Sequence, residues 1–138
     1  MQSDTLPISK SRRWTARVLS AIAIVFLLFD SVIHLMVTAP VVESFNQLGY
    51  PVSLAFGLGI IEIACLVLYG IPQTSICGAL LLTGYLGGAV AAQLRIGAPL
   101  LSTTLFPVYV GVMVWGGLYL RDDLLHKIIP FRKGEAQQ

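Results

Sequence analysis

Two acidic residues and a histidine lie inside apolar stretches of this 138-residue chain. Asp30 and His34 belong to FLLFDSVIHL, and Glu62 lies in GLGIIEIACL. Asp30 and His34 are four positions apart, so a helix would place them on one face, about one turn from each other. A carboxylate at the centre of a bilayer costs on the order of 2.5 to 3.5 kcal/mol on insertion scales. Such groups must be neutralised, paired or hydrated, and we expect Asp30 and His34 to share one proton and titrate as a unit.

Four apolar stretches carry these polar groups, at residues 18–39, 52–71, 75–94 and 101–120. Each is close to the ~20 residues that a helix needs to cross ~30 Å of hydrocarbon. The chain is 56% hydrophobic and only 12% charged, and its mean hydropathy of +0.80 is typical of membrane proteins and excludes a soluble domain. We therefore predict an all-α integral membrane four-helix bundle with short connections. It forms a single domain, with polar cytoplasmic tails at residues 1–13 and 126–138.

The positive charges predict the orientation. Eight of the nine Lys and Arg residues lie near the two ends, and only Arg95 lies between them. The positive-inside rule then places both termini in the cytoplasm of a multi-pass protein, with residues 124–133 lying along the inner surface. No basic, aromatic-interleaved face runs through the chain, so the expected partner is the lipid bilayer and not a nucleic acid.

A secretory signal is the competing interpretation of the N-terminus. SRRWTAR precedes an apolar run, and residues 37–39, Val-Thr-Ala, loosely fit a cleavage site. The run is too long for a signal, and a disposable segment has no reason to carry Asp30 and His34. A retained first span is therefore favoured.

Counting residues from the inner boundary at ~1.5 Å each indicates how deep the polar groups lie. Four of them share a layer at roughly 14 to 20 Å, and three others lie at roughly 25 to 30 Å, nearer the outer face. The candidate intramembrane ligand site consists of Asp30, His34, Glu62, Tyr85, Tyr109 and Gln93. The alternative is that these groups only hold the helices in register, through interhelical hydrogen bonds worth roughly 0.6 to 2 kcal/mol each. Cys65 and Cys77 have no metal-ligand spacing, so we expect buried structural thiols, rather than a redox pair, and no metal site.

Small residues predict where helices pack. Glu62 shares a helix face with Ala55, Gly59, Cys65 and Tyr69, which indicates a close helix contact. Gly84 and Gly88 in the third stretch, like the glycines of the fourth (Gly111, Gly116 and Gly117), predict faces that a neighbouring helix approaches closely.

The connection between the first two spans has its own pattern. PVVESFNQLGYP carries apolar residues at helical spacing, with polar residues opposite (Val41, Val42, Phe45 and Leu48 against Glu43, Ser44, Asn46 and Gln47). A short amphipathic helix is therefore expected at the outer end of the bundle, as a connector or as a lid.

Several segments, in this order, resemble the DoxX-like family of small four-helix bacterial membrane proteins: RWTARVLSAIAIVFLLFDSVIHL, QLGYP, GLGIIEIACLVLYGIP, GALLLTGYLGGAVAAQLRIGAPL and LFPVYVGVMVWGGLYLR. The resemblance covers nearly residues 13 to 121 and implies the bacterial inner membrane. Some of the related DoxX and DoxD proteins are linked to quinone-dependent sulfur oxidation or to membrane oxidoreductase complexes that handle thiol stress. Asp30 and Glu62 fall on the family's polar positions. His34 stands where many members carry lysine, and Gln93, where histidine is frequent, lacks a titratable group.

The resemblance implies a membrane subunit or accessory of a quinone-linked redox system. In it, His34 would hydrogen-bond a quinone carbonyl, and Asp30 or Glu62 would donate a proton. The alternatives are a non-catalytic scaffold, which holds a partner membrane protein through the glycine face of Gly84 and Gly88, and a small carrier with a polar track. The candidate protein partners are a membrane oxidoreductase or a second copy of the chain. The sequence contains no Walker loop, no CxxC motif and no nucleophile with a nearby base outside the membrane, so an autonomous soluble-type enzyme is not expected. Catalytic activity itself stays open.

Overall fold

The computed structural model describes residues 9–129, in which every regular element is helical. The helices are α1 (Lys10–Leu35), α2 (Ala39–Leu48), α3 (Leu54–Gly70), α4 (Ser75–Arg95), the π-helical turn η1 (Leu100–Thr104), α5 (Phe106–Arg121) and α6 (Asp123–Ile128). Three segments, Lys10–Leu35, Ser75–Arg95 and Leu100–Arg121, are long and apolar enough to cross a membrane, and α3 is a shorter apolar helix. The predicted all-α membrane helical bundle is confirmed. The predicted tails at residues 1–13 and 126–138 fall largely outside the described residues.

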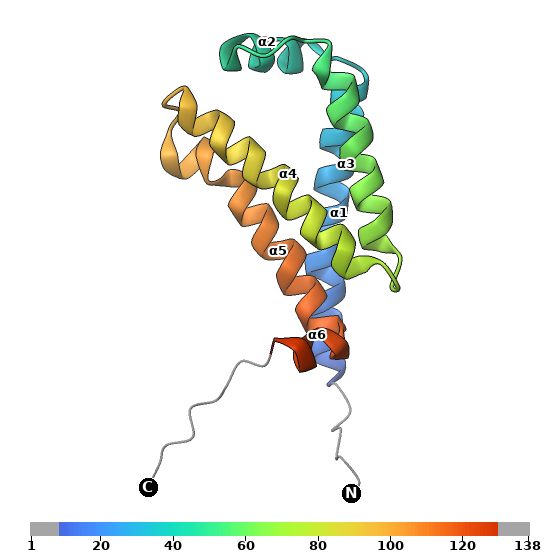
Figure 1. Ribbon diagram of the computed structural model, residues 1–138. Coiled ribbons are helices and arrows are strands. Elements are labelled where there is room, and N and C mark those ends of the chain that lie inside the picture. Colours follow the sequence, from blue (N-terminus) through green and yellow to red (C-terminus); the bar gives the residue numbers. More distant parts are fainter. Residues whose placement is uncertain (1–8, 130–138) are drawn as a thin grey trace, which may run out of the picture.

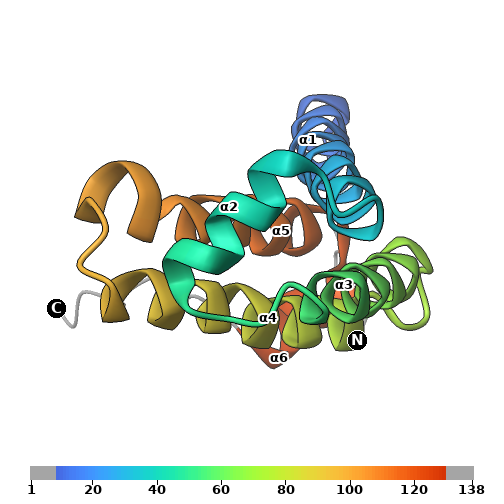
Figure 2. The ribbon, with the colours of Figure 1, turned by 90° about the horizontal axis from the view of Figure 1, so that it is seen from above.

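The long helices form two pairs that separate toward one end. α1 packs against both α3 and α5, and α4 packs against α3 and α5. In Figure 1, α4 and α5 lean away from α1 and α3 toward the end where α2 lies, whereas the start of α1 and α6 lie at the opposite end. Seen from above in Figure 2, α2 crosses that end from α1 toward α4.

Small side chains let α1 approach its neighbours. Its buried face repeats at helical spacing and consists of Ala16, Ser20, Ala23, Leu27 and Ser31. On α5, a Cβ added at Gly117 would lie 2.3 Å from Ser20 Oγ, so only glycine fits there. The two helices are thus in close contact at the end that carries most of the basic residues.

The first long helix ends earlier than expected. α1 stops at Leu35 instead of continuing to Ala39, because Val37 adopts a left-handed backbone with φ of 47° and Pro40 has no N–H to continue the helical hydrogen bonds. The fourth stretch also differs, since η1 and Leu105 precede α5 and the regular helix begins only at Phe106. Both breaks lie toward the end capped by α2.

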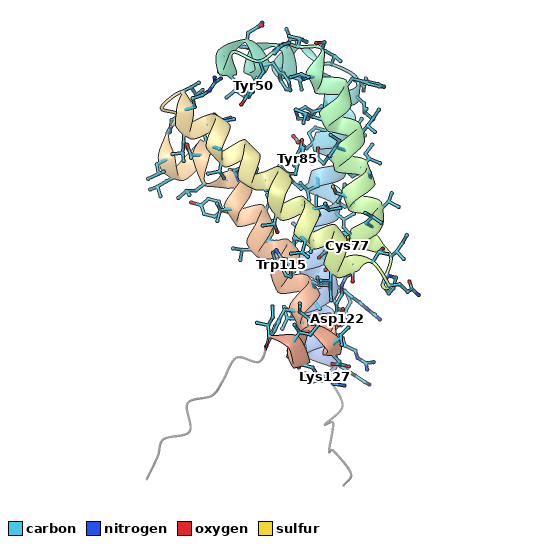
Figure 3. The ribbon with its side chains drawn as sticks, in the orientation of Figure 1. Tyr50, Cys77, Tyr85, Trp115, Asp122 and Lys127 are labelled. Atoms are coloured by element: carbon cyan, nitrogen blue, oxygen red, sulfur yellow. The ribbon has the colours of Figure 1, made fainter. Side chains whose placement is uncertain are left out.

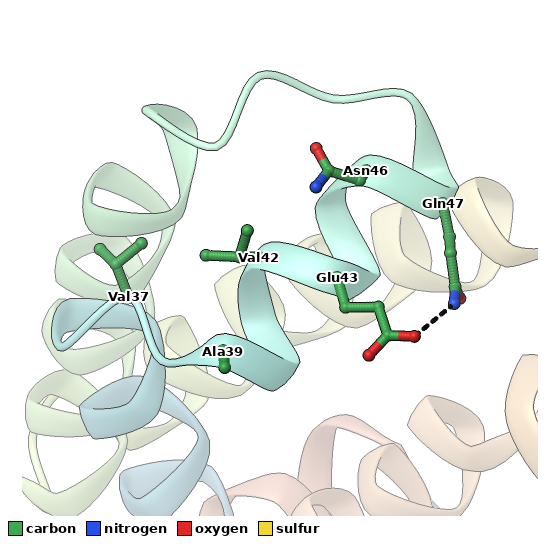
Figure 4. Close-up of a pocket in the computed structure, with 6 residues that line it drawn as sticks. All are labelled: Val37, Ala39, Val42, Glu43, Asn46 and Gln47. Atoms are coloured by element: carbon green, nitrogen blue, oxygen red, sulfur yellow. Dashed lines mark hydrogen bonds between the residues drawn. The ribbon is translucent and has the colours of Figure 1, made fainter.

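The expected amphipathic helix is present as α2. Val41 and Phe45 are buried against Ala55 of α3, and Gly49, with φ of 70°, ends the helix in a left-handed cap. Figure 4 shows the outer side of α2, where a shallow pocket is lined by three apolar residues (Val37, Ala39 and Val42) and three polar ones (Glu43, Asn46 and Gln47). Gln47 donates a hydrogen bond to Glu43 there. This helix therefore lies between the outer pocket and the interior of the bundle, toward which Val41 and Phe45 point.

The far end of α2 is held to the third long helix of the chain, α4. The Arg95 guanidinium donates a hydrogen bond to the Leu48 carbonyl and lies over the Tyr50 ring, 5.1 Å from its centroid. α2 is thus held at both ends, by α1 through the turn at Val37 and by α4 through Arg95.

Two of the glycines predicted to mediate helix packing do not do so. Within the described residues, a Cβ added at Gly84 or Gly88 would meet no atom within 4 Å. Close contacts occur instead at Gly59, where a Cβ would lie 3.0 Å from the Ser31 carbonyl oxygen, and at Gly78, where it would lie 2.3 Å from the Tyr69 nitrogen. The prediction for Gly84 and Gly88 is therefore wrong for neighbours within the described chain, in which α4 and α5 lean away from α1 and α3 (Figure 1).

Candidate functional site

The space left by the separating helices is a cavity of about 670 Å³. It is lined by α1, α3, α4 and α5, and it is bounded at one end by Ser44, Phe45 and Leu48 of α2. Gly84 and Gly88 form part of its wall. The missing side chains of these glycines therefore leave room in a cavity and do not admit a neighbouring helix.

Most of the cavity wall is apolar. Phe26 and Phe106 meet edge to face with their ring centroids 5.1 Å apart, and Leu58 and Val110 line it as well. The described residues that line the cavity include no lysine or arginine. An apolar body therefore fits this part of the cavity, and the charge of any acidic group in it has no basic partner other than a histidine.

The polar part of the cavity is formed by Asp30, His34 and Glu62. Each offers one potential ligand atom, and the three atoms lie within 4.8 Å of one another. Asp30 and His34 are one turn apart on α1, with Asp30 Oδ2 3.4 Å from His34 Nδ1, so the predicted contact between them is confirmed. His34 Nδ1 is also 2.8 Å from the Asp30 carbonyl oxygen, and its ring packs edge to face against Phe45 at 5.9 Å.

Glu62 reaches this cluster from α3 and has an unusual environment. Its side chain is 0% exposed, and it lies on the buried face with Ala55, Gly59 and Tyr69, as the sequence predicted. Tyr85 donates a hydrogen bond to Glu62 Oε2 at 3.2 Å, and Figure 3 shows Tyr85 on the side of α4 that faces α3. Among the described residues Glu62 Oε1 has no hydrogen-bond partner. Such a buried, unpaired acceptor is costly unless something else pairs with it.

The two remaining candidate residues, Gln93 and Tyr109, are placed differently relative to the cavity. Gln93 lines the cavity near its α2 end. Tyr109 does not line it, because the buried face of α5 carries Val110 and Val114. Tyr109 is 47% exposed and donates instead to the Leu101 carbonyl of η1, at 3.0 Å. Counting depth along a helix could not detect this, since depth says nothing of the direction in which a side chain points.

The sequence analysis missed the aromatic residues that shape the cavity. Phe45 covers His34, and Phe26 and Phe106 form a wall, yet none of the three was assigned to the site. The pattern of α2 contained a signal for Phe45, because its apolar face had to point into the bundle. No local signal indicates that Phe26 and Phe106 meet, since they are 80 positions apart.

The cysteines lie outside this constellation. Cys65 is buried in the main core and Cys77 is exposed, and both are free thiols. The expected buried location therefore holds for Cys65 and is wrong for Cys77. The chemistry available in the cavity is that of two carboxyl groups, an imidazole and a phenol at one end of an apolar space. Such a set can exchange protons, hydrogen-bond an oxygen-bearing headgroup or supply oxygen and nitrogen ligands to a metal ion.

Comparison with known proteins gives one match. The sequence model of the DoxX-like family matches residues 18–117, a range that contains every residue lining the cavity. Neither curated proteins nor solved structures yield a match.

Proposed function

This chain belongs to the DoxX-like family, and from that premise we propose that it is a membrane subunit or accessory of a quinone-linked redox system. In this proposal the cavity binds a prenylated quinone or a similar amphiphile. The observation that carries it is Glu62, a fully buried carboxyl group at the polar end of an apolar cavity, with Oε1 lacking a partner. A ligand headgroup that pairs with this oxygen would remove a penalty of about 1 to 3 kcal/mol.

The residues present fit a quinone in size and polarity. The volume of about 670 Å³ lies within the range of about 300 to 1,000 Å³ usual for small-molecule sites. His34 would hydrogen-bond a carbonyl oxygen of the ring, and Asp30 or Glu62 would give or accept a proton. The wall formed by Phe26 and Phe106 would hold the apolar tail. When bound, a quinone supplies two-electron chemistry coupled to protons, and a membrane oxidoreductase partner would exchange the electrons.

The proposal includes a multi-pass arrangement in the bacterial inner membrane with both termini in the cytoplasm. It is supported by the distribution of charge: Arg12, Arg13 and Arg17 begin α1 and Arg121 ends α5, at the end of the bundle opposite α2. Arg95 lies at the α2 end. α3 has 17 residues, which rise about 25 Å. This is near the lower limit for a span, and a bilayer accommodates it by local thinning.

The scaffold and carrier alternatives have weaker support. Partner binding through Gly84 and Gly88 loses its basis because both glycines line the cavity. A carrier would need a continuous polar path across the membrane. Beyond Asp30, His34 and Glu62, the candidate residue that continues such a path toward the α2 end is Gln93. A homo-oligomer formed by other surfaces is compatible with the proposal.

Native mass spectrometry with organic extraction tests the proposed ligand. The samples would be the wild-type protein, Glu62→Gln and Asp30→Asn, purified in native-lipid nanodiscs. We expect a prenylated quinone to copurify with the wild type and to be reduced or lost in both variants. Lipid alone in all three samples would refute the proposal and leave the polar residues as contacts between helices.

A further inference from the structure

We propose that Asp30, His34 and Glu62 bind a divalent transition-metal ion, of the kind from Mn²⁺ to Zn²⁺, at the polar end of the cavity. The three residues come from two helices, and their ligand atoms already lie within 4.8 Å of one another. This inference deepens the proposed function and concerns the same cavity, because the ion would lie between the three side chains and the headgroup of the proposed ligand, whose oxygen would then pair with the ion instead of with His34 or Glu62.

The geometry is close to that of a metal site. Metal–oxygen and metal–nitrogen bonds of about 2.0 to 2.2 Å place neighbouring ligand atoms roughly 3 to 4 Å apart. Asp30 Oδ2 lies 3.4 Å from the His34 ring at Nδ1, so the carboxylate and the imidazole are already adjacent. A side-chain movement of about 1 Å would bring even two ligand atoms 4.8 Å apart to the spacing found between neighbouring ligands of a metal ion. One imidazole and two carboxylates suit Mn²⁺, Fe²⁺ or Zn²⁺ better than Mg²⁺ or Ca²⁺, which prefer oxygen alone.

The surroundings of these side chains match the outer shell of a metal site. Histidines that bind metals usually donate their other ring N–H to a carbonyl or carboxylate. His34 Nδ1 lies 2.8 Å from the Asp30 carbonyl oxygen, and a proton donated there leaves Nε2 as the metal-binding nitrogen. Tyr85 holds Glu62 Oε2, and Oε1 is buried and without a partner. The second oxygen of a positioned carboxylate is thus available to an ion.

Charge favours a divalent cation over a monovalent one. Two carboxylates in an apolar, membrane-embedded cavity carry two negative charges, and the described lining provides no lysine or arginine to neutralise them. A doubly charged ion would cancel both at once. Three protein ligands also leave coordination positions open toward the cavity, where an oxygen of the proposed ligand would bind.

Cobalt(II) binding tests the inference without any organic ligand. Tag-free full-length protein in nanodiscs would be titrated with Co²⁺, with the visible d–d absorption and the bound metal content as readouts. We expect one Co²⁺ per chain, displaced by Zn²⁺. Loss of an outer-shell group weakens metal binding by about 10- to 100-fold, so Glu62→Gln and His34→Asn, which remove ligands, should weaken it by about tenfold or more. Glu43→Gln removes an exposed carboxylate on α2 and is the matched control, expected to bind like the wild type.

Wild-type protein that binds no stoichiometric Co²⁺ would overturn the inference, whatever the variants do. Equal Co²⁺ binding by the wild type, Glu62→Gln and His34→Asn would overturn it as well. Quinone content measured on the same samples separates the two proposals. A quinone without Co²⁺ binding refutes the metal site alone, and Co²⁺ binding without a quinone refutes the quinone proposal alone.

Discussion

Filling the cavity from its glycine wall should displace the proposed ligand while every polar group stays in place. Gly88 lines the cavity, and a Cβ added there would meet no atom within 4 Å among the described residues. Gly88→Leu would therefore place four carbon atoms in space that the ligand is proposed to occupy. Gly87→Leu is the matched control, since Gly87 is the preceding residue of the same helix, has the same free space around it and does not line the cavity.

The expected size of the effect follows from burial. Each methylene-sized group of a ligand that loses its place in an apolar cavity forfeits about 0.8 kcal/mol. Displacement of two to four such groups by the new leucine would cost roughly 1.6 to 3.2 kcal/mol, which is about a 10- to 200-fold loss of affinity. Both substitutions replace glycine within a helix, so each should gain roughly 0.5 to 1 kcal/mol of helix propensity. Gly88→Leu is thus expected to fold at least as well as the control.

The assay compares the quinone content per chain of the two variants and the wild type, extracted from nanodiscs of the same lipid composition. The wild type and Gly87→Leu should retain the quinone, and Gly88→Leu should lose most of it. Equal retention by Gly87→Leu and Gly88→Leu would refute the reasoning, because it would mean that the ligand does not occupy this cavity. Equal loss in both would indicate that the effect arises from the helix surface and not from the cavity.

The remaining predictions concern the free energy of unfolding, measured in mixed micelles. Tyr85→Phe removes the hydrogen bond to Glu62 and leaves both carboxyl oxygens without a partner, so it should destabilise the protein by about 1 to 3 kcal/mol. Tyr109→Phe, at an exposed tyrosine, should lower the free energy of unfolding clearly less, and equal losses in the two variants would contradict this account. Gly117→Ala places a methyl group against the backbone of α1 and should cost about 1 to 3 kcal/mol, whereas Gly57→Ala, in open space on α3, should be neutral or stabilising by up to about 1 kcal/mol. A harmless Gly117→Ala would show that α1 and α5 are not in close contact.

Local periodicity was sufficient for several features of this chain. The apolar stretches predicted a helical membrane protein, and the pattern of the outer connection predicted α2. Spacing along one helix also predicted that Asp30 would contact His34, and that Glu62 would lie on the buried face of α3. These predictions succeed because helical geometry alone determines which residues share a face.

The cavity depends instead on how the helices are placed relative to one another. The sequence placed Gly84 and Gly88 on a small-residue face and Tyr109 in the polar layer, but α4 leans away from α1 and α3, and α5 turns Tyr109 outward. Periodicity describes a face relative to the axis of its own helix. The tilt and rotation of each axis come instead from contacts with other helices, such as Gly117 with Ser20 and Gly78 with Tyr69. Those contacts hold the helices close at one end and let them separate at the other. This separation is why Glu62 of α3 meets Asp30 and His34 of α1 beside an open space and not within a packed core.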